Sequence, residues 1–211
     1  MATDDTSTAG RGTCQVEAWT ERVDAARSIT LAPACGLTDD LELDTSFSRG
    51  AAQPTIVSAA AAGFKWVPGA ASFDTALGIV RLGGIAFGAW ARDPLRGWRG
   101  DYVALVGLAS LTPMPELNLY VNAFVTHNLD RGPHLSGARA ALAWQSGERW
   151  LWFVEGLAAS DATRAVNAGF RFWLRPDVLG LDVVGSRPWA DGRSPGLGVG
   201  IGVGWYGLQL F

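Results

Sequence analysis

The feature that most constrains this chain is its last stretch, GLGVGIGVGWYGLQLF, which runs from Gly196 to Phe211. Apolar residues alternate here with glycine at a strict period of two, the period at which the side chains of a β-strand share one face. The apolar residues of this face are Leu197, Val199, Ile201, Val203 and Trp205. Such a face requires apolar surroundings, either the core of a soluble protein or the hydrocarbon of a bilayer.

Eleven further runs with strand character precede this stretch. They lie at about residues 14–22, 27–36, 39–49, 54–66, 76–91, 101–111, 116–127, 136–146, 149–159, 163–175 and 178–186. Most have the roughly 9 to 11 residues that a tilted strand needs to cross the hydrocarbon. We therefore predict an all-β fold, a single antiparallel up-and-down transmembrane β-barrel at residues 14–211. About twelve strands are expected, with ten or fourteen as the alternatives.

The connections between these runs follow the pattern of barrels with short periplasmic turns and longer external loops. Three of the longest gaps, ARDPLRGWRG, HNLDRGPHLS and SRPWADGRSPG, become external loops when both chain ends are placed in the periplasm. The connection after Lys65 is an exception, because it is long for a periplasmic turn. Residues 1–13 are polar, small and without period, so they predict a flexible periplasmic tail.

Composition agrees with a membrane setting. The chain is 48% hydrophobic, with ten tryptophans and a single lysine. The tryptophans gather near the predicted strand ends, where an amphipathic ring is favoured at a membrane interface. No apolar run reaches the roughly 18 residues of a membrane helix. A net charge of −3 gives no indication of nucleic acid binding.

Met1 is followed by acidic, polar residues rather than by a secretory leader, so we interpret the chain as a mature form with an added start methionine.

The C-terminus resembles the closing-strand signal of Gram-negative outer-membrane β-barrel proteins. The residues that carry this resemblance are Val203, Trp205, Gly207 and the terminal Phe211, while Gln209 stands where the signal usually has an apolar residue. The resemblance implies a location in the bacterial outer membrane. It also implies two partners, the lipid bilayer and the machinery that inserts barrels into it.

Two cysteines lie symmetrically about a polar turn near residues 24–26. A hairpin over this turn places Cys14 opposite Cys35, as a cross-strand disulfide requires. A disulfide fits an oxidising compartment such as the periplasm. The alternative is a pair of buried free thiols, since spacing alone does not establish a bond.

Charged and amide side chains fall on the faces opposite the apolar ones, which predicts a polar lumen. The residues expected to line it are Glu17, Glu21, Glu42, Asp44, Arg81, Asn118, Asn122, Arg139, Glu155, Arg171, Arg175 and Asp182. These charges either pair and fill a narrow interior or line a pore that selects solutes. The prediction is thus a narrow channel for small polar or charged solutes, or a structural barrel without an assigned role.

An enzymatic alternative rests on His134 and Ser136. Residues two apart in a strand share one face, within reach for a base and a nucleophile. This unit resembles the His-x-Ser of the outer-membrane phospholipase and of the lipid A deacylase, which implies a lipid hydrolase. The phospholipase pattern continues differently, because Gly137 follows here.

A third hypothesis is a soluble β-barrel binding protein, because apolar and polar side chains alternate in the sheets of soluble proteins as well. With two histidines and a predicted disulfide, the sequence contains no zinc constellation, and we expect no metal or cofactor. The glycines of the last stretch do not open a helix, as a phosphate-binding loop would require, and instead predict a thin inner wall.

Overall fold

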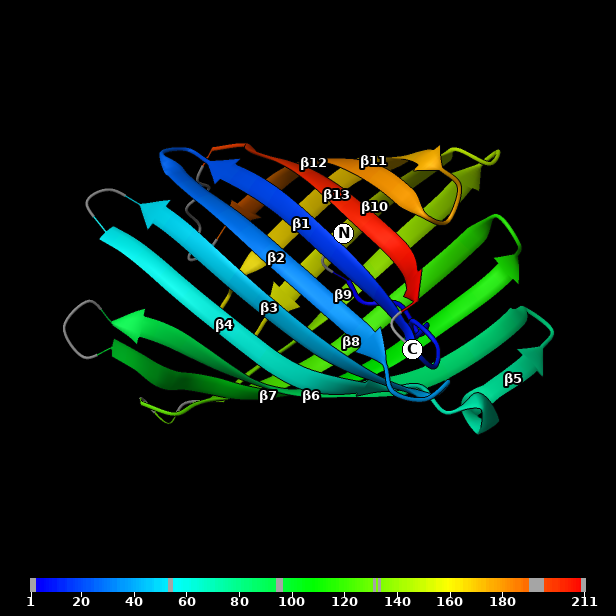
Figure 1. The fold of residues 1–211 in the computed structure, drawn as a ribbon, viewed down its shortest axis with the longest axis horizontal. Coiled ribbons are helices and arrows are strands. Elements are labelled where there is room, and N and C mark those ends of the chain that lie inside the picture. The colour runs from blue at the N-terminus through cyan, green and yellow to red at the C-terminus, as the bar shows by residue number, and fades with distance from the viewer. Residues whose placement is uncertain are drawn as a thin grey trace.

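The computed structural model of the chain describes residues 3–52, 55–93, 97–130, 132, 134–189 and 196–209. In these residues, a single antiparallel sheet contains thirteen strands (Figure 1). They are β1 (Thr13–Val23), β2 (Ala26–Gly36), β3 (Leu41–Ala52), β4 (Thr55–Trp66), β5 (Ser72–Thr75), β6 (Gly78–Asp93), β7 (Gly97–Met114), β8 (Leu117–Asn128), β9 (His134–Ser146), β10 (Trp150–Ala159), β11 (Arg164–Arg175), β12 (Leu179–Trp189) and β13 (Gly198–Gln209). Among the same residues, no helix is long and apolar enough to span a membrane.

The sheet closes on itself into a barrel. Strands adjacent in sequence pair with one another, and β1 pairs with β13 along its whole length. β4 pairs directly with β6, whereas the short β5 pairs only with β6 and projects from one end of the barrel (Figure 1). The ring therefore has twelve strands, which confirms the predicted all-β, closed antiparallel barrel and its strand count.

The long connection after Lys65 has a structural explanation. Trp66, the last residue of β4, pairs with Gly84, so residues 78–83 of β6 extend beyond the end of β4. A short 3₁₀ turn at Gly69–Ala71 leads into β5, which pairs with the start of this extension. The predicted long turn is thus a hairpin that continues β6 outside the ring.

The first strand of the ring begins, and the last strand ends, at the same end of the barrel, which we call the terminal end. These strands are β1 and β13, and the opposite end is called the distal end. Cys14 and Cys35 are directly paired between β1 and β2 near the terminal end and form a disulfide. This confirms the cross-strand bridge that the spacing predicted.

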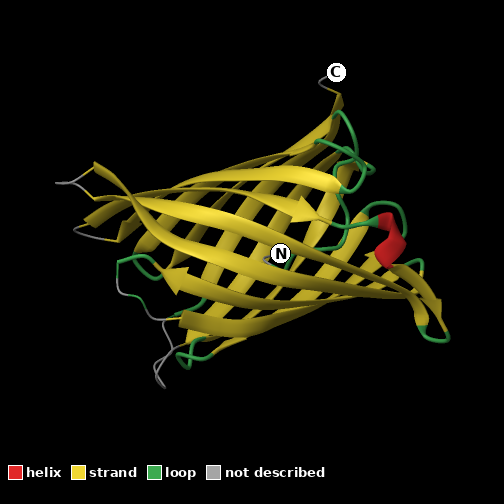
Figure 2. Ribbon diagram, turned by 90° about the horizontal axis from the view of Figure 1, so that it is seen from below, coloured by secondary structure: helices red, strands yellow, loops and turns green. Residues whose placement is uncertain are grey.

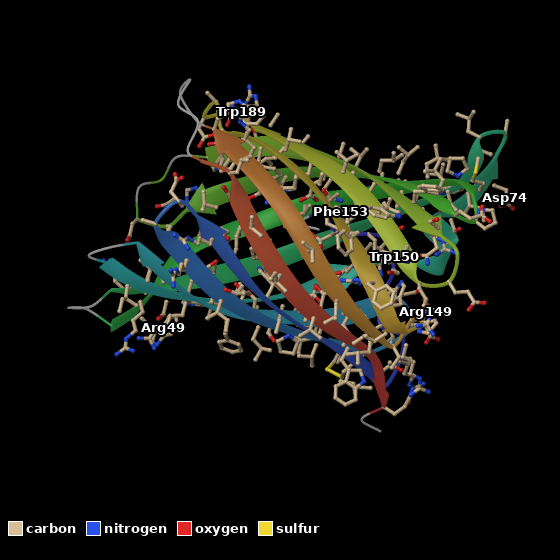
Figure 3. The ribbon with its side chains drawn as sticks, turned by 90° about the horizontal axis from the view of Figure 1, so that it is seen from above. Arg49, Asp74, Arg149, Trp150, Phe153 and Trp189 are labelled. Carbon is tan, nitrogen blue, oxygen red and sulfur yellow. A yellow bond between two sulfur atoms is a disulfide. The ribbon has the colours of Figure 1, made fainter. Side chains whose placement is uncertain are left out.

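Apolar side chains cover the outside of the barrel. Phe47, Leu105 and Ile201 are 55%, 61% and 57% exposed, whereas Glu42, Asn122 and Glu155 inside are at most 5% exposed. This distribution is the inverse of a soluble protein and matches a barrel surrounded by lipid. Exposed tryptophans lie toward both ends, and Figure 3 shows Trp150 and Trp189 at opposite ends.

Candidate functional site

Residues 3–9 follow the inside of the barrel, and residues 10–12 lead to β1 at the terminal end, where the Arg11 N–H donates to Asp39 Oδ1 at 3.3 Å; the sequence predicts a loose tail here. The contacts of residues 3–9 reach strands on different sides of the ring, which Figure 1 and Figure 2 show from two directions at right angles. The Thr3 backbone N–H and hydroxyl donate to Glu155 Oε2 at 2.8 and 2.9 Å. Asp4 N–H donates to Asn122 Oδ1 at 2.8 Å, and Asn122 Nδ2 donates back to the Asp4 carbonyl at 3.0 Å. We call residues 3–12 the inner segment.

The inner segment also contacts the wall closer to the terminal end. The Lys65 ammonium lies 3.1 Å from Asp5 Oδ1, and the Thr6 hydroxyl contacts Ser110 Oγ. The Ala9 N–H donates to Glu42 Oε2 at 2.6 Å. The wall residues in these contacts come from β3, β4 and β7, whereas Asn122 and Glu155 come from β8 and β10. The segment therefore crosses the lumen between widely separated strands.

These contacts explain four buried polar side chains. Glu42, Lys65, Asn122 and Glu155 are between 1% and 6% exposed. Burial of a charge is unfavourable unless a partner compensates for the lost water. The inner segment supplies backbone N–H groups to both glutamates and a carboxylate to Lys65.

A second cluster surrounds Arg171 on β11. Its Nε and Nη2 atoms donate to the two carboxylate oxygens of Asp182, both at 2.7 Å, and Nη2 donates to Glu17 at 3.0 Å. The guanidinium carbon also lies 5.2 Å from the Trp173 ring and 5.0 Å from the Tyr206 ring. Bidentate pairing and stacking on aromatic faces hold an arginine in one orientation. Glu17 on β1 and Asp182 on β12 thus meet at one arginine where the ring closes.

Two glycines make room for the arginine cluster. A Cβ atom added at Gly204 would lie 2.4 Å from the Tyr206 hydroxyl oxygen, and one at Gly180 would lie 2.9 Å from Arg171 Cδ. Both distances are shorter than non-bonded carbon atoms tolerate. The inward glycines of β13 thus thin the wall where the large side chains of the cluster fold over it.

The remaining predicted lining residues fall into two groups. Glu21, Asn118 and Arg139 face the lumen, and Asp44 lies on the inward face of β3 with Glu42. Glu21 accepts a hydrogen bond from Ser186 at 3.2 Å, Asn118 accepts one from Thr112 at 2.7 Å, and Arg139 lies 5.7 Å from the Phe124 ring centre.

Arg81 and Arg175 are exposed at the terminal end instead. Arg81 pairs with Ser72 on the hairpin outside the ring. Arg175 follows a register shift at the end of β11. Neither the hairpin extension nor the register shift is visible in the alternation of the sequence.

His134 and Ser136 lie on the outer face of β9, on the same side as the exposed Leu142 and Trp144. His134 is directly opposite His127 on β8, and their ring centres are 4.7 Å apart. Among the described residues, no hydrogen bond joins His134 to Ser136, and the Ser136 N–H donates to Ser160 Oγ at 3.2 Å. The arrangement does not assemble a base and a nucleophile.

The residues of the C-terminal signal are partly described. Val203 and Trp205 face outward and are 39% and 54% exposed. Gly207 adopts a φ of 72°, which favours glycine. Phe211 lies outside the described residues.

Several lumen residues were not predicted from the sequence. Lys65, Ser110, Trp173 and Tyr206 all contact the inner segment or the Arg171 cluster. Lys65 carried a usable signal, because it is the single lysine of the chain and lies within a strand of small and apolar residues. The sequence of the inner segment gave no signal of its position, since most of its residues are short and polar.

The fold of this chain is similar to the folds of several known proteins. No protein-family model matches the sequence, and no curated protein matches it. The structure is similar to the KdgM porin, with a TM-score of 0.64, 8% identity, and coverage of 90% of this chain and 98% of that one. It is also similar to the NanC porin, with a TM-score of 0.57, 7% identity, and coverage of 92% and 98%. The CymD monoaromatic hydrocarbon channel has a TM-score of 0.54, 8% identity, and coverage of 96% and 90%. The chain therefore has the fold of bacterial outer-membrane β-barrels, and its apolar outer face fits that membrane.

Proposed function

We propose that the protein is a narrow outer-membrane channel for small polar or charged solutes, whose bore is restricted by the inner segment. The observation that carries this proposal is the polar lumen of a closed twelve-stranded ring. Barrels of eight strands are filled by their own side chains, whereas those of sixteen or more leave an aqueous channel. Two of the similar structures are named porins and a third is named a channel, which supports transport.

The charge of the lumen favours cations. Among the described wall residues that face inward, the acids are Glu17, Glu21, Glu42, Asp44, Glu155 and Asp182. The inward bases are Lys65, Arg139 and Arg171. Asp4 and Asp5 of the inner segment add further negative charge. Rings of carboxylates attract cations and repel anions within a low-dielectric wall.

The inner segment is the part of the molecule that sets the bore. Its anchors on β3, β4, β7, β8 and β10 lie around a large part of the ring, so the segment occupies space that a solute would need. We place the terminal end in the periplasm, because this puts the longer loops outside, as is usual for these barrels. In this orientation the insertion machinery reads the closing strand β13.

Conductance in planar bilayers tests the proposal. We expect small, cation-selective channels from the intact protein, and about two- to fivefold larger ones after deletion of residues 3–9, because the deletion widens the bore. Glu21→Lys should lower the cation preference, whereas Asp161→Lys, on an exposed turn, should leave it unchanged. Silence of both the intact and the shortened protein would contradict a channel and favour a structural barrel.

A further inference from the structure

Four arginines of neighbouring strands in the β1–β6 part of the ring lie on its outer face at the distal end. They are Arg22 on β1, Arg27 on β2, Arg49 on β3 and Arg92 on β6, and all four are exposed. Arg27 is two residues from the exposed Ile29, and Arg49 is two residues from the exposed Phe47, so both arginines lie on the outward face of their strands. Figure 3 shows Arg49 at the end of the barrel opposite Arg149 and Asp74. We call this group the arginine belt.

The register of the strands brings the belt together. Arg22 is directly opposite Arg27, and Arg49 is opposite both Ile29 on β2 and Ser58 on β4. Ser58 is in turn opposite Arg92. Neighbouring strands are about 4.8 Å apart, so the backbone positions of Arg22 and Arg27 are adjacent, and those of Arg49 and Arg92 are separated only by Ser58.

The patch lacks an anionic partner among the described residues. The described residues form four ion pairs, and none of the four includes an arginine of the belt. Asp24, two residues after Arg22, accepts the Gly196 N–H through both carboxylate oxygens, and Arg22 Nε donates to the Asp24 backbone carbonyl instead. Asp130 of the same end pairs with Arg99. Like charges directly opposite each other on a sheet are unfavourable, so the belt is suited to an external anion.

The position of the belt indicates where that anion comes from. Immediately toward the terminal end, the outer face presents Ile29, Leu31, Phe47 and Trp90, all between 42% and 60% exposed. The belt therefore lies at the edge of the apolar band, at the depth of lipid headgroups. Arginine pairs with phosphate through two parallel N–H groups, which makes it suited to phosphorylated headgroups.

We propose that the arginine belt binds the phosphate groups of anionic lipid in the leaflet at the distal end. The bound chemistry is a lipid-borne phosphate held by Arg22 and Arg27, with Arg49 and Arg92 extending the site along the wall. This inference depends on the outer face alone, and it stands whether or not the lumen conducts.

Native mass spectrometry of the detergent-solubilised, full-length protein tests the site. We expect retention of phosphatidylglycerol and of a bisphosphorylated lipid A over phosphatidylcholine, and a loss of about tenfold in that retention in Arg22→Gln/Arg27→Gln. Arg149→Gln/Arg175→Gln, at the terminal end, is the matched control and should behave as the unmodified protein. Heat-modifiable migration checks that each variant is folded, and Arg49→Gln/Arg92→Gln serves as a second pair if the first does not fold.

Two results would overturn the proposal. One is equal retention of anionic and zwitterionic lipid, or an equal loss in the belt and control variants. The other is complete displacement of the lipid by low millimolar inorganic phosphate, which would identify a site for free anions. Retention that resists phosphate and falls only in the belt variants supports a lipid site.

Discussion

Arg171 contacts polar and aromatic side chains on four different strands. Its partners come from β1, β12 and β13 as well as from its own strand β11. Gly180 and Gly204 leave the space that its side chain and Tyr206 occupy. The side chain of one arginine therefore links β1 to the last strands, and two glycines leave the space that this side chain and Tyr206 need.

Replacement of Arg171 should weaken the seam where β1 meets the last strands. Arg171→Ala leaves Glu17 and Asp182 close together without a cation, and we expect a loss of about 2–4 kcal/mol in the free energy of unfolding. Arg171→Lys retains the charge but not the bidentate geometry, so it should lose less. Urea unfolding in lipid vesicles, followed by tryptophan fluorescence, measures both. An Arg171→Ala protein as stable as the parent would show that the cluster does not stabilise the seam.

The inner segment is the element whose behaviour depends on pH. Enclosure within the barrel acts to raise the pKa of the Asp5 carboxyl, but the Lys65 ammonium and two hydrogen bonds from Ser7 outweigh it, so the pKa lies below its ordinary value. A depressed pKa means that the ionised carboxylate favours the docked segment. Its contribution is complete above the ordinary pKa of 3.8 and is lost as the pH falls through the lowered value.

Protonation of Asp5 in acid should therefore weaken the docking of the inner segment. We expect the hydrogen-exchange protection factors of residues 3–9 to stay high from neutral pH down to about pH 4 and to fall below it. Asp5→Asn removes the titrating group, so exchange should be faster at neutral pH and depend less on acid. An unchanged pH profile in Asp5→Asn would assign the effect to another carboxylate.

At the scale of the whole molecule, stability follows from closure and from the lipid around it. The outer face is mainly apolar between the arginine belt and the terminal end, and within the described residues the ring leaves no unpaired strand edge apart from the short β5. A closed barrel of this kind resists unfolding by detergent at room temperature because its backbone hydrogen bonds lie within a continuous ring.

We expect the folded protein to require detergent or lipid and to show heat-modifiable migration in gel electrophoresis. The unheated sample should run as a compact band and the boiled sample as a slower one, with a β-rich circular dichroism spectrum before heating. A water-soluble monomer that remains folded without detergent would contradict the membrane barrel.

The sequence alone determined the strands of the ring and the side chains that face lipid, and it predicted that the two cysteines lie opposite each other. These properties are local, since alternation at a period of two assigns a face to each residue and a hairpin places Cys14 opposite Cys35. The contact between Glu17 on β1 and Arg171 on β11 follows from closure of the ring, which pairs β1 with β13. Arg81 and Arg175 were assigned to the lumen because a hairpin extension and a register shift leave no mark on that alternation.

Only the tertiary structure decided where residues 3–12 lie. Their polar pattern predicts a tail, because no short-range signal links Thr3 to Glu155, which is 152 positions away. Closure of the barrel gathers Glu42, Lys65, Asn122 and Glu155 around one space, and buried polar groups there require partners. The inner segment satisfies them, so the closing strand that the sequence identified completes a barrel whose interior is occupied by the other end of the chain.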